Sequence, residues 1–310
     1  MSYIAIDIGA TNIRVATGNY NGLKRKIMRP TDIKNGSGGV SKQIIKLIES
    51  IRTEEPSAIG IGSIGPIDLE KGMITNTPNY PLQNIPIEEP LVEEYKVPVT
   101  IVNDCAAAVM GEQMFGAGRG MENLVYVTIS TGLGAGAIVD DNLLLGKDGN
   151  AVEAGHFTIF PDSDIVCGCG CRGHWEAFCS GKNIPSFVNS LLDSNNWVNS
   201  ELYKLARGTP KNITAKNLYT AAKKGDAYSL GIVKRIGEIN AIGFANIVNA
   251  YDPELITVGG SIALNNPKLT LTPIKENIQK YTINRIPEIK ITPLGQDAVI
   301  IGALALAMQI

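Results

Sequence analysis

The segment CGCGCRGHWE, residues 167–176, contains three of the five cysteines in this 310-residue chain. It also contains His174, and the only other histidine, His156, ends the nearby segment EAGH. Thiolate and imidazole groups together bind Zn²⁺ in tetrahedral sites, whereas a thioredoxin-like redox pair has the spacing C-x-x-C instead of C-x-C. Thiols at the shorter spacing rarely close an unstrained disulfide. The cluster therefore favours structural zinc over redox-active or incidental cysteines.

A second group of residues is suited to binding phosphate. The segment DIGATN, residues 7–12, places Asp7 at the end of an apolar strand and follows it with a glycine turn. Backbone N–H groups in such a turn can hold phosphate oxygens. Asp7 could hold hydrated Mg²⁺, because this ion binds few carboxylates and keeps several waters. The alternative is a glycine hairpin in which the Asp only accepts local N–H groups.

Two further glycine turns follow. ISTGLGAG, residues 129–136, repeats the strand, turn and strand pattern with Thr131 as a hydroxyl donor, and VGGS, residues 258–261, allows a flat ring or a ribose to approach the backbone. Each could be an ordinary turn. Two turns of the first kind, in separate halves of the chain, could bind a polyphosphate from both sides. Neither has the GxxxxGKS/T or GxGxxG spacing, which weakens the Walker and Rossmann interpretations.

A candidate general base lies in VNDCAAAVMGE, residues 102–112. A strand ends at Asn103 and Asp104, and alanines at helical spacing follow. A carboxylate at the end of a strand that faces a cleft can accept a proton from a substrate hydroxyl, as phosphoryl transfer requires. The alternative is that Asp104 only caps the helix.

The order of elements predicts an α/β protein. A helical pattern at residues 41–52 places Ile44, Ile48 and Ile51 on one face, and a short turn between the first two strands predicts an antiparallel hairpin where a Rossmann unit would continue into a helix. The predicted strands are residues 3–8, 13–18, 57–62, 97–102, 124–130, 133–140 and 254–258, and the later helices are residues 227–250 and 298–308.

Composition limits the possible partners and location. A net charge of -2 gives no positive field for nucleic acid, and 44% hydrophobic residues suffice for a core. We see no signal peptide, and the longest apolar stretch, residues 298–308, is too short to cross a bilayer. The clustered cysteines are unlike a secreted disulfide framework. We therefore expect a cytoplasmic protein with no nucleic-acid or membrane partner.

Taken together, these motifs resemble those of the ROK family of sugar kinases, within the sugar kinase, Hsp70 and actin ATPase superfamily. DIGATN resembles the first phosphate motif, ISTGLGAG the second, VGGS the adenosine motif, and AVIIGALALAM the C-terminal helix. VND, EAGH and CGCGCRGHWE are more specific, and the last resembles the ROK zinc pattern C-x-C-G-x-x-G-C-x-E. The resemblance covers the chain from end to end.

The resemblance implies a two-domain actin-like ATPase fold, also called ribonuclease H-like, with a cleft between the domains. Residues 1–117 plus 297–310 would form the smaller N-terminal α/β domain. Residues 118–296 would form the larger C-terminal α/β domain, which would contain the zinc site. Three glycines at residues 116–120 make a boundary near there plausible.

The resemblance also implies roles for individual residues. Asp104 would be the catalytic base. Residues that contact sugar hydroxyls would be Asn103, Asp104, Glu153, His156 and Glu176. Residues that bind the nucleotide and hydrated Mg²⁺ would be Asp7, Gly9, Thr11, Asn12, Thr131, Gly132, Gly259, Gly260 and Ser261.

The zinc ligands implied by the resemblance are His156, Cys167, Cys169 and His174. The family pattern has its last cysteine where this chain has His174, so Cys171 competes as the fourth ligand. Alignment backward from Glu176 favours His174, and zinc accepts the exchange of Cys for His. A closed site of four ligands would be architectural instead of catalytic.

The implied activity is ATP-dependent phosphorylation of the C6 hydroxyl of a hexose, with glucose as the expected substrate. An N-acetylhexosamine kinase, acting on N-acetylmannosamine, is the alternative, and the choice depends on loops such as residues 64–80. A sugar-responsive transcription repressor is remote, because the chain starts directly in its first strand with no basic stripe. A homodimer or homotetramer is also implied.

Overall fold

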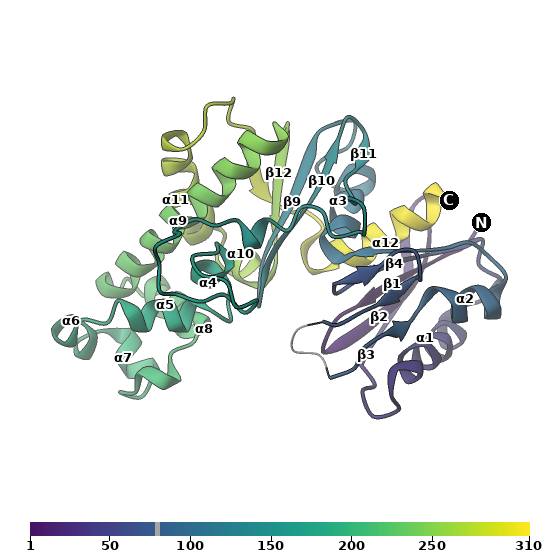
Figure 1. The fold of residues 1–310 in the computed structure, drawn as a ribbon, viewed down its shortest axis with the longest axis horizontal. Helices are drawn as coiled ribbons and strands as arrows, with labels where there is room; N and C mark the ends of the chain where they lie inside the picture. The colour runs from purple at the N-terminus through teal and green to yellow at the C-terminus, as the bar shows by residue number, and fades with distance from the viewer. Residues whose placement is uncertain (78–80) are drawn as a thin grey trace. The chain divides into compact units, whose positions relative to one another are not determined.

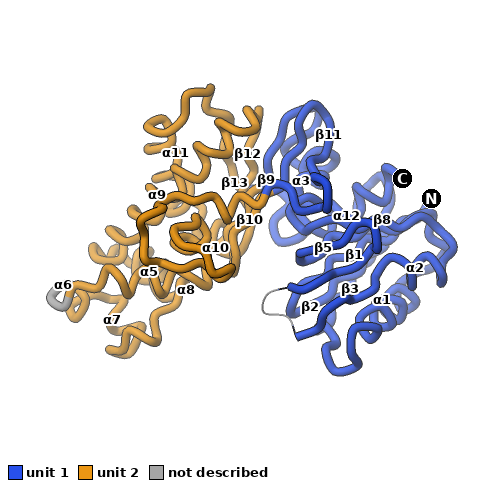
Figure 2. The backbone as a smooth tube through the Cα atoms, in the orientation of Figure 1, with its two compact units in different colours: residues 1–126, 136–152, 292–310 blue, residues 127–135, 153–291 orange. Residues whose placement is uncertain are grey.

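The computed structural model describes residues 1–77 and 81–310 (Figure 1). The last three residues of the loop at 64–80 therefore lie outside the described residues. The chain forms two compact units: residues 1–126, 136–152 and 292–310 make the first, and residues 127–135 and 153–291 make the second (Figure 2). In the part of the chain that is described, no helix has both the length and the apolar character needed to cross a membrane.

The first unit contains a five-stranded sheet in the order β3-β2-β1-β4-β8. The strands are β1 (Tyr3–Ile8), β2 (Asn12–Asn19), β3 (Gly22–Pro30), β4 (Ala58–Ser63) and β8 (Val99–Asn103). Strands β1, β2 and β3 pair antiparallel, whereas β4 and β8 continue the sheet in parallel with β1. The predicted hairpin between the first two strands is confirmed.

Helices cover both faces of this sheet. They are α1 (Ser37–Ile51), α2 (Glu88–Tyr95), α3 (Asp104–Phe115) and α12 (Ala298–Gln309). Alternate residues of β1 point to opposite faces. Ile4 and Ile6 join a core cluster with α1, whereas Tyr3 and Ala5 pack with α12 on the other face (Figure 1). β1 is therefore buried at every position, as its apolar sequence requires.

Helix α12 lies very close to α3. A Cβ atom on Gly302 of α12 would lie 1.7 Å from the carbonyl oxygen of Ala107 in α3. Only a glycine fits there, so the chain's C-terminal helix packs against the helix that begins at Asp104. This contact connects the C-terminus of the chain to the element that carries the candidate base.

A second five-stranded sheet has the order β11-β10-β9-β12-β13, and a three-stranded sheet has the order β5-β6-β7. Strands β9 (Leu124–Ile129) and β10 (Leu133–Val139) pass from one unit to the other along the chain. The remaining strands are β5 (Ile67–Asp68), β6 (Met73–Ile74), β7 (Ile85–Pro86), β11 (Asn142–Leu143), β12 (Leu255–Gly259) and β13 (Glu288–Ile291).

The second unit is mainly helical around β12 and β13. Its α-helices are α4 (Glu176–Cys179), α5 (Ile184–Ser190), α6 (Ser194–Val198), α7 (Glu201–Leu205), α8 (Ala215–Lys223), α9 (Ala227–Tyr251), α10 (Ser261–Asn265) and α11 (Pro267–Asn277). Short 3₁₀ turns are η1 (Ala154–His156), η2 (Pro210–Asn212), η3 (Ile278–Lys280) and, in the first unit, η4 (Gly295–Asp297).

The predicted strands and helices are confirmed, with ends shifted by a few residues. The largest shift is in α1, which begins at Ser37 where the apolar pattern predicted residue 41. Strand β3 was not predicted from the sequence. It is the edge strand of its sheet and is mostly exposed, so its sequence GLKRKIMRP lacks the alternation of a half-buried strand.

Candidate active site and metal centre

The predicted base and the first glycine turn lie at the same edge of the first sheet. Strands β1, β4 and β8 are parallel, and their register aligns Ile8 with Ser63 and Ser63 with Asn103. The turn after β1 and the start of α3 after β8 therefore leave the sheet at its carboxyl edge. Ligands of open α/β sheets bind at this edge.

Asn103 is the N-cap of α3, and Asp104 is the first residue of the helix. The Oδ1 atom of Asn103 accepts a hydrogen bond from the Cys105 backbone N–H at 2.8 Å, which is the usual role of a cap. The Oδ1 atom of Asp104 accepts from the same N–H at 2.7 Å. The structure therefore gives the capping role to Asn103, and the Asp104 carboxylate lies at the helix N-terminus.

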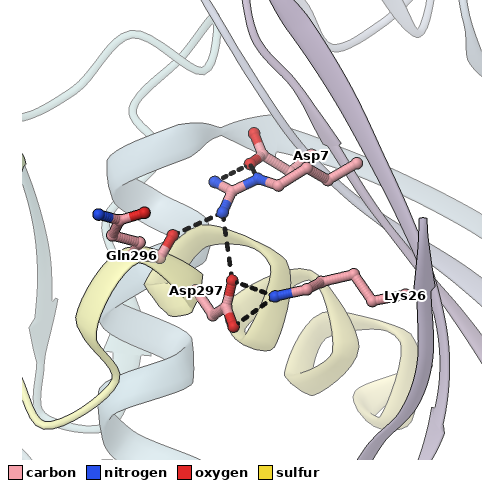
Figure 3. Close-up of polar contacts among 5 residues, drawn as sticks. Asp7, Lys26, Gln296 and Asp297 are labelled. Carbon is pink, nitrogen blue, oxygen red and sulfur yellow. Dashed lines mark hydrogen bonds and ion pairs between the residues drawn. The ribbon is translucent and has the colours of Figure 1, made fainter. Parts of the chain in front are cut away.

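Asp7 is buried and forms an ion pair with Arg14 (Figure 3). The Nε atom of Arg14 donates to Oδ2 of Asp7 at 2.5 Å, and Nη2 contacts the same oxygen. Burial raises the pKa of Asp7 to about 6, with a smaller contribution from nearby Asp104, and the Arg14 guanidinium opposes the rise. Asp7 is thus a buried carboxylate with a defined cationic partner and a second carboxylate close by.

The first glycine turn is held by Thr31. The backbone N–H of Gly9 donates to the Asn12 carbonyl at 2.9 Å, which closes the turn. The Thr31 hydroxyl donates to the Gly9 carbonyl, and the Thr31 N–H donates to the Thr11 carbonyl, both at 2.9 Å. These bonds occupy carbonyl groups of the turn and fix its shape, as a phosphate-binding turn requires.

The second glycine turn lies beside the VGGS segment. The Ser130 and Ser261 hydroxyl oxygens are 3.2 Å apart. Gly260 has φ +85°, and a Cβ atom there would lie 2.5 Å from the Ile129 carbonyl oxygen, so only glycine allows this approach. The structure thus brings together Thr131 and Gly132 on one side and Gly259–Ser261 on the other.

A pocket of about 830 Å³ opens at these two segments, and its lining includes Thr131 and Ser261. Its volume is within the range of small-molecule sites. Lysines also line it: Lys182, Lys216 and Lys223. An ammonium group is a good partner for phosphate oxygens. The pocket therefore has the size and charge to hold a phosphorylated ligand.

The two histidines and two of the cysteines converge in the second unit. The ligand atoms of His156, Cys167, Cys169 and His174 all lie within 4.8 Å of one another. The two Nδ1 atoms of the histidines are 3.2 Å apart. Sγ of Cys167 is 3.8 Å from Nδ1 of His156, and Sγ of Cys169 is 3.3 Å from Nδ1 of His174. This group contains His174 and not Cys171, which is exposed.

These distances fit the edges of a zinc tetrahedron. Bonds of about 2.0 Å to nitrogen and about 2.3 Å to sulfur place two nitrogens about 3.3 Å apart and a nitrogen about 3.5 Å from a sulfur. Burial raises the pKa of the Cys167 thiol to about 12, so a thiolate there needs a cation beside it. The donor set and its spacing therefore fit Zn²⁺.

Two carboxylates adjoin the metal cluster. Oε2 of Glu153 is 3.8 Å from Nε2 of His156, the ring nitrogen that the cluster does not use. Oε1 of Glu176 is 3.6 Å from Sγ of Cys167, and Oε2 accepts from the Leu133 backbone N–H at 3.0 Å. Glu176 therefore contacts both the metal cluster and the second glycine turn.

The cysteine segment is anchored by Trp175. This side chain is fully buried, packs edge-on against Phe244 of α9, and donates from Nε1 to Oδ1 of Asn240 at 2.8 Å. A Cβ atom on Gly243 would lie 2.3 Å from the indole ring, so the small residue makes room for it. Packing of Trp175 thus fixes the residue between His174 and Glu176.

Sequence reasoning missed several residues of this site. Arg14 lies on β2, directly after the first glycine turn. Its spacing from Asp7 in a hairpin could have indicated a cross-strand pair. Thr31, Asp297 and Lys182 come from distant parts of the chain, and no local signal marks them. The predicted residues themselves fall in two groups: residues 7–12, 103 and 104 in the first unit, and the remainder in the second.

Comparisons with known proteins bear on this site. The chain matches the ROK family over residues 3–310. It is 40% identical to a glucokinase from Pyrobaculum calidifontis, covering 99% of this chain and 95% of the relative. A ROK glucokinase from Streptomyces griseus, solved with glucose and AMPPNP, is similar with a TM-score of 0.81 and 27% identity over all of both chains.

A ROK hexokinase from Thermus thermophilus is also similar, with a TM-score of 0.84 and 29% identity over 100% of this chain and 98% of the other. The predicted α/β fold of the actin-like ATPase type is therefore confirmed.

Proposed function

Because this chain belongs to the ROK family and is an ATP-dependent sugar kinase, we propose that it transfers the γ-phosphoryl group of ATP to the C6 hydroxyl of a hexose, with glucose as the preferred substrate. The observation that carries the proposal is the position of Asp104. It lies at the carboxyl edge of the first sheet, in register with the glycine turn after β1. The relatives named glucokinase favour glucose as the sugar.

In the proposed reaction, Asp104 accepts the proton of the C6 hydroxyl while its oxygen attacks the γ-phosphorus. The bond from the γ-phosphorus to the bridging oxygen breaks, and ADP leaves. Backbone N–H groups of the two glycine turns donate to phosphate oxygens whose charge rises in the transition state. Bound Mg²⁺ would neutralise phosphate charge, and Asp7 would hold it through water.

In this proposal, the sugar is bound by polar residues that the family motifs mark. Asn103, Glu153, His156 and Glu176 contact its hydroxyls together with Asp104. Carboxylates suit this role because each can accept hydrogen bonds from two hydroxyls.

Zinc is architectural in this proposal. His156, Cys167, Cys169 and His174 would hold it, and four protein ligands leave no position for a substrate. The ion would fix the cysteine segment and with it Glu176, whose carboxylate lies beside Cys167. Zinc would therefore act on sugar binding through the position of protein groups.

A sugar panel tests the proposal. We expect ADP release to be fastest with glucose when kcat/KM is compared for glucose, mannose, N-acetylglucosamine and N-acetylmannosamine at fixed ATP. Omission of sugar gives the background of ATP hydrolysis. Preference for an acetylated sugar would replace the proposed substrate with the N-acetylhexosamine alternative, and release that no sugar stimulates would refute the kinase reaction.

A further inference from the structure

We infer that Arg14, held in place by Asp297, is a positioning residue that orients Asp7 to receive a hydrated divalent cation. The inference rests on the proposed function and adds two residues to it. Asp7 and Arg14 are directly opposite each other in the register of β1 and β2. Side chains of opposite residues in an antiparallel pair lie on the same face of the sheet and can interact.

The guanidinium of Arg14 binds only one oxygen of Asp7. Its Nε and Nη2 atoms both contact Oδ2. Figure 3 shows the second oxygen of Asp7 turned away from the guanidinium. The ion pair therefore stabilises the charge of a buried carboxylate and leaves its other oxygen directed elsewhere.

The other end of the guanidinium is held by the segment before α12. Nη1 of Arg14 donates to the Gln296 carbonyl at 2.5 Å and to Oδ1 of Asp297 at 3.3 Å. Nζ of Lys26, on β3, donates to both oxygens of Asp297, at 2.7 and 2.6 Å. Charges thus alternate along the series Asp7, Arg14, Asp297 and Lys26 (Figure 3).

A planar guanidinium that is bound at both ends has little freedom to rotate. Asp297 therefore fixes the plane of the Arg14 guanidinium and, with it, the direction from which Arg14 contacts Asp7. Asp297 also directly precedes the helix that packs against α3. The series connects the strand that carries Asp7 to the helix next to the candidate base.

Calorimetric titration of the full chain with ADP, with and without Mg²⁺, tests the inference. We expect Mg²⁺ to strengthen ADP binding to the unmodified protein. In Arg14→Ala, the gain in ADP affinity that Mg²⁺ produces should fall about tenfold or more, because this is the usual effect of losing a group that orients a metal-binding residue. Binding of metal-free ADP should be unchanged. Asp297→Asn should reduce the gain less, because an amide oxygen still accepts from Arg14.

Arg52→Ala is the matched control. Arg52 is a half-buried arginine in ion pairs with Glu49 and Glu55 of the same unit, and its loss should leave the gain unchanged. Arg14→Lys should recover part of the gain, because one ammonium can contact Asp7 without reaching Asp297. If Arg14→Ala does not fold, as its melting temperature would show, Asp297→Asn and Arg14→Lys carry the test.

Three results would overturn the inference. The first is an unchanged gain in Arg14→Ala, and the second is the absence of any gain in the unmodified protein. The third is weaker binding of metal-free ADP to Arg14→Ala, because Arg14 would then contact the nucleotide itself. The sugar panel is run separately, so failure of the kinase reaction would not be confused with failure of this inference.

Discussion

The two regions that carry the candidate site hold their carboxylates in different ways. In the first unit, Asp7 lies on a regular strand, and its partner Arg14 is the opposite residue on the next strand. In the second unit, Glu176 follows an irregular segment that has only isolated bridges at residues 158 and 174 and at 166 and 172 among its described residues. Sheet register positions the first carboxylate, whereas side-chain packing and a metal would position the second.

The structures of the two regions should therefore depend to different degrees on a bound ligand or metal. Hydrogen bonds of the sheet hold Asp7, and Asp104 begins α3 directly after β8, so regular secondary structure places both. Residues 153–178 have turn hydrogen bonds and isolated bridges but no regular strand pairing among their described residues. A metal bound by such a segment adds its binding free energy to the free energy of folding. Four predictions test the contrast, from the largest expected effect to the smallest.

The largest effect is expected at the sheet edge. Asp104→Asn removes the proposed base but keeps its size, so kcat should fall about a hundredfold or more while the KM for sugar changes little. Turnover is measured at saturating ATP and glucose. Glu55→Gln is the control, because Glu55 pairs with Arg52 at the surface of the same unit and should leave kcat unchanged. Near-normal turnover of Asp104→Asn would remove it as the base.

The next effect is expected at the metal cluster. Cys167→Ser replaces a buried ligand, so zinc content measured by elemental analysis should fall from about one ion per chain to a small fraction of that. Cys171→Ser is the matched control: it changes a nearby cysteine that is exposed and outside the cluster, and should keep its zinc. The reverse pattern would make Cys171 the ligand, and no zinc in the unmodified protein would refute the site.

Removal of zinc by a chelator should affect the structure of the second region and leave the first unchanged. After zinc is removed, we expect faster amide hydrogen exchange in residues 153–178, because the segment loses its cross-link, and unchanged exchange in β1 and β2. Mass spectrometry of peptides from both regions measures this, and re-addition of zinc should restore protection. Equal loss of protection in both regions would show that the contrast between them is wrong.

A smaller effect is expected when the anchor of the cysteine segment is trimmed. Trp175→Phe removes the indole N–H and leaves the buried Asn240 oxygen without its donor, which should lower the free energy of unfolding by about 1 to 3 kcal/mol. Denaturant unfolding measures the change. Zinc content should be unchanged, because the ligand residues remain. Loss of zinc in this variant would mean that packing, and not the ligands alone, forms the site.

Much of the fold follows from local patterns. Alternation and length identify β1, β2, β9 and β10, and helical periodicity identifies α1 and α9, because these elements bury one face or both. Strand β3 and the short helices of residues 184–205 escaped prediction. An exposed edge strand and helices of one or two turns carry too few apolar residues for a periodic signal.

The candidate site likewise has features that the sequence predicts and contacts that it does not. Glycine turns, a carboxylate after a strand and a cluster of Cys and His residues are recognisable because their chemistry depends on residue type and close spacing. The contacts of Arg14 and Glu176 were not predicted. Arg14 reaches Asp297, which is 283 residues away in the chain, and Glu176 reaches Leu133, 43 residues away. No spacing rule connects residues so far apart.

The sequence by itself therefore determined the class of fold, the glycine turns and the residue types available for chemistry, because each depends on interactions between near neighbours in the chain. Only the tertiary structure decided that Asn103 caps α3, that His174 lies with His156, Cys167 and Cys169, and that Asp7 is held through Arg14 from the start of the C-terminal helix. Those choices depend on how distant segments pack, and packing is a property of the whole folded chain.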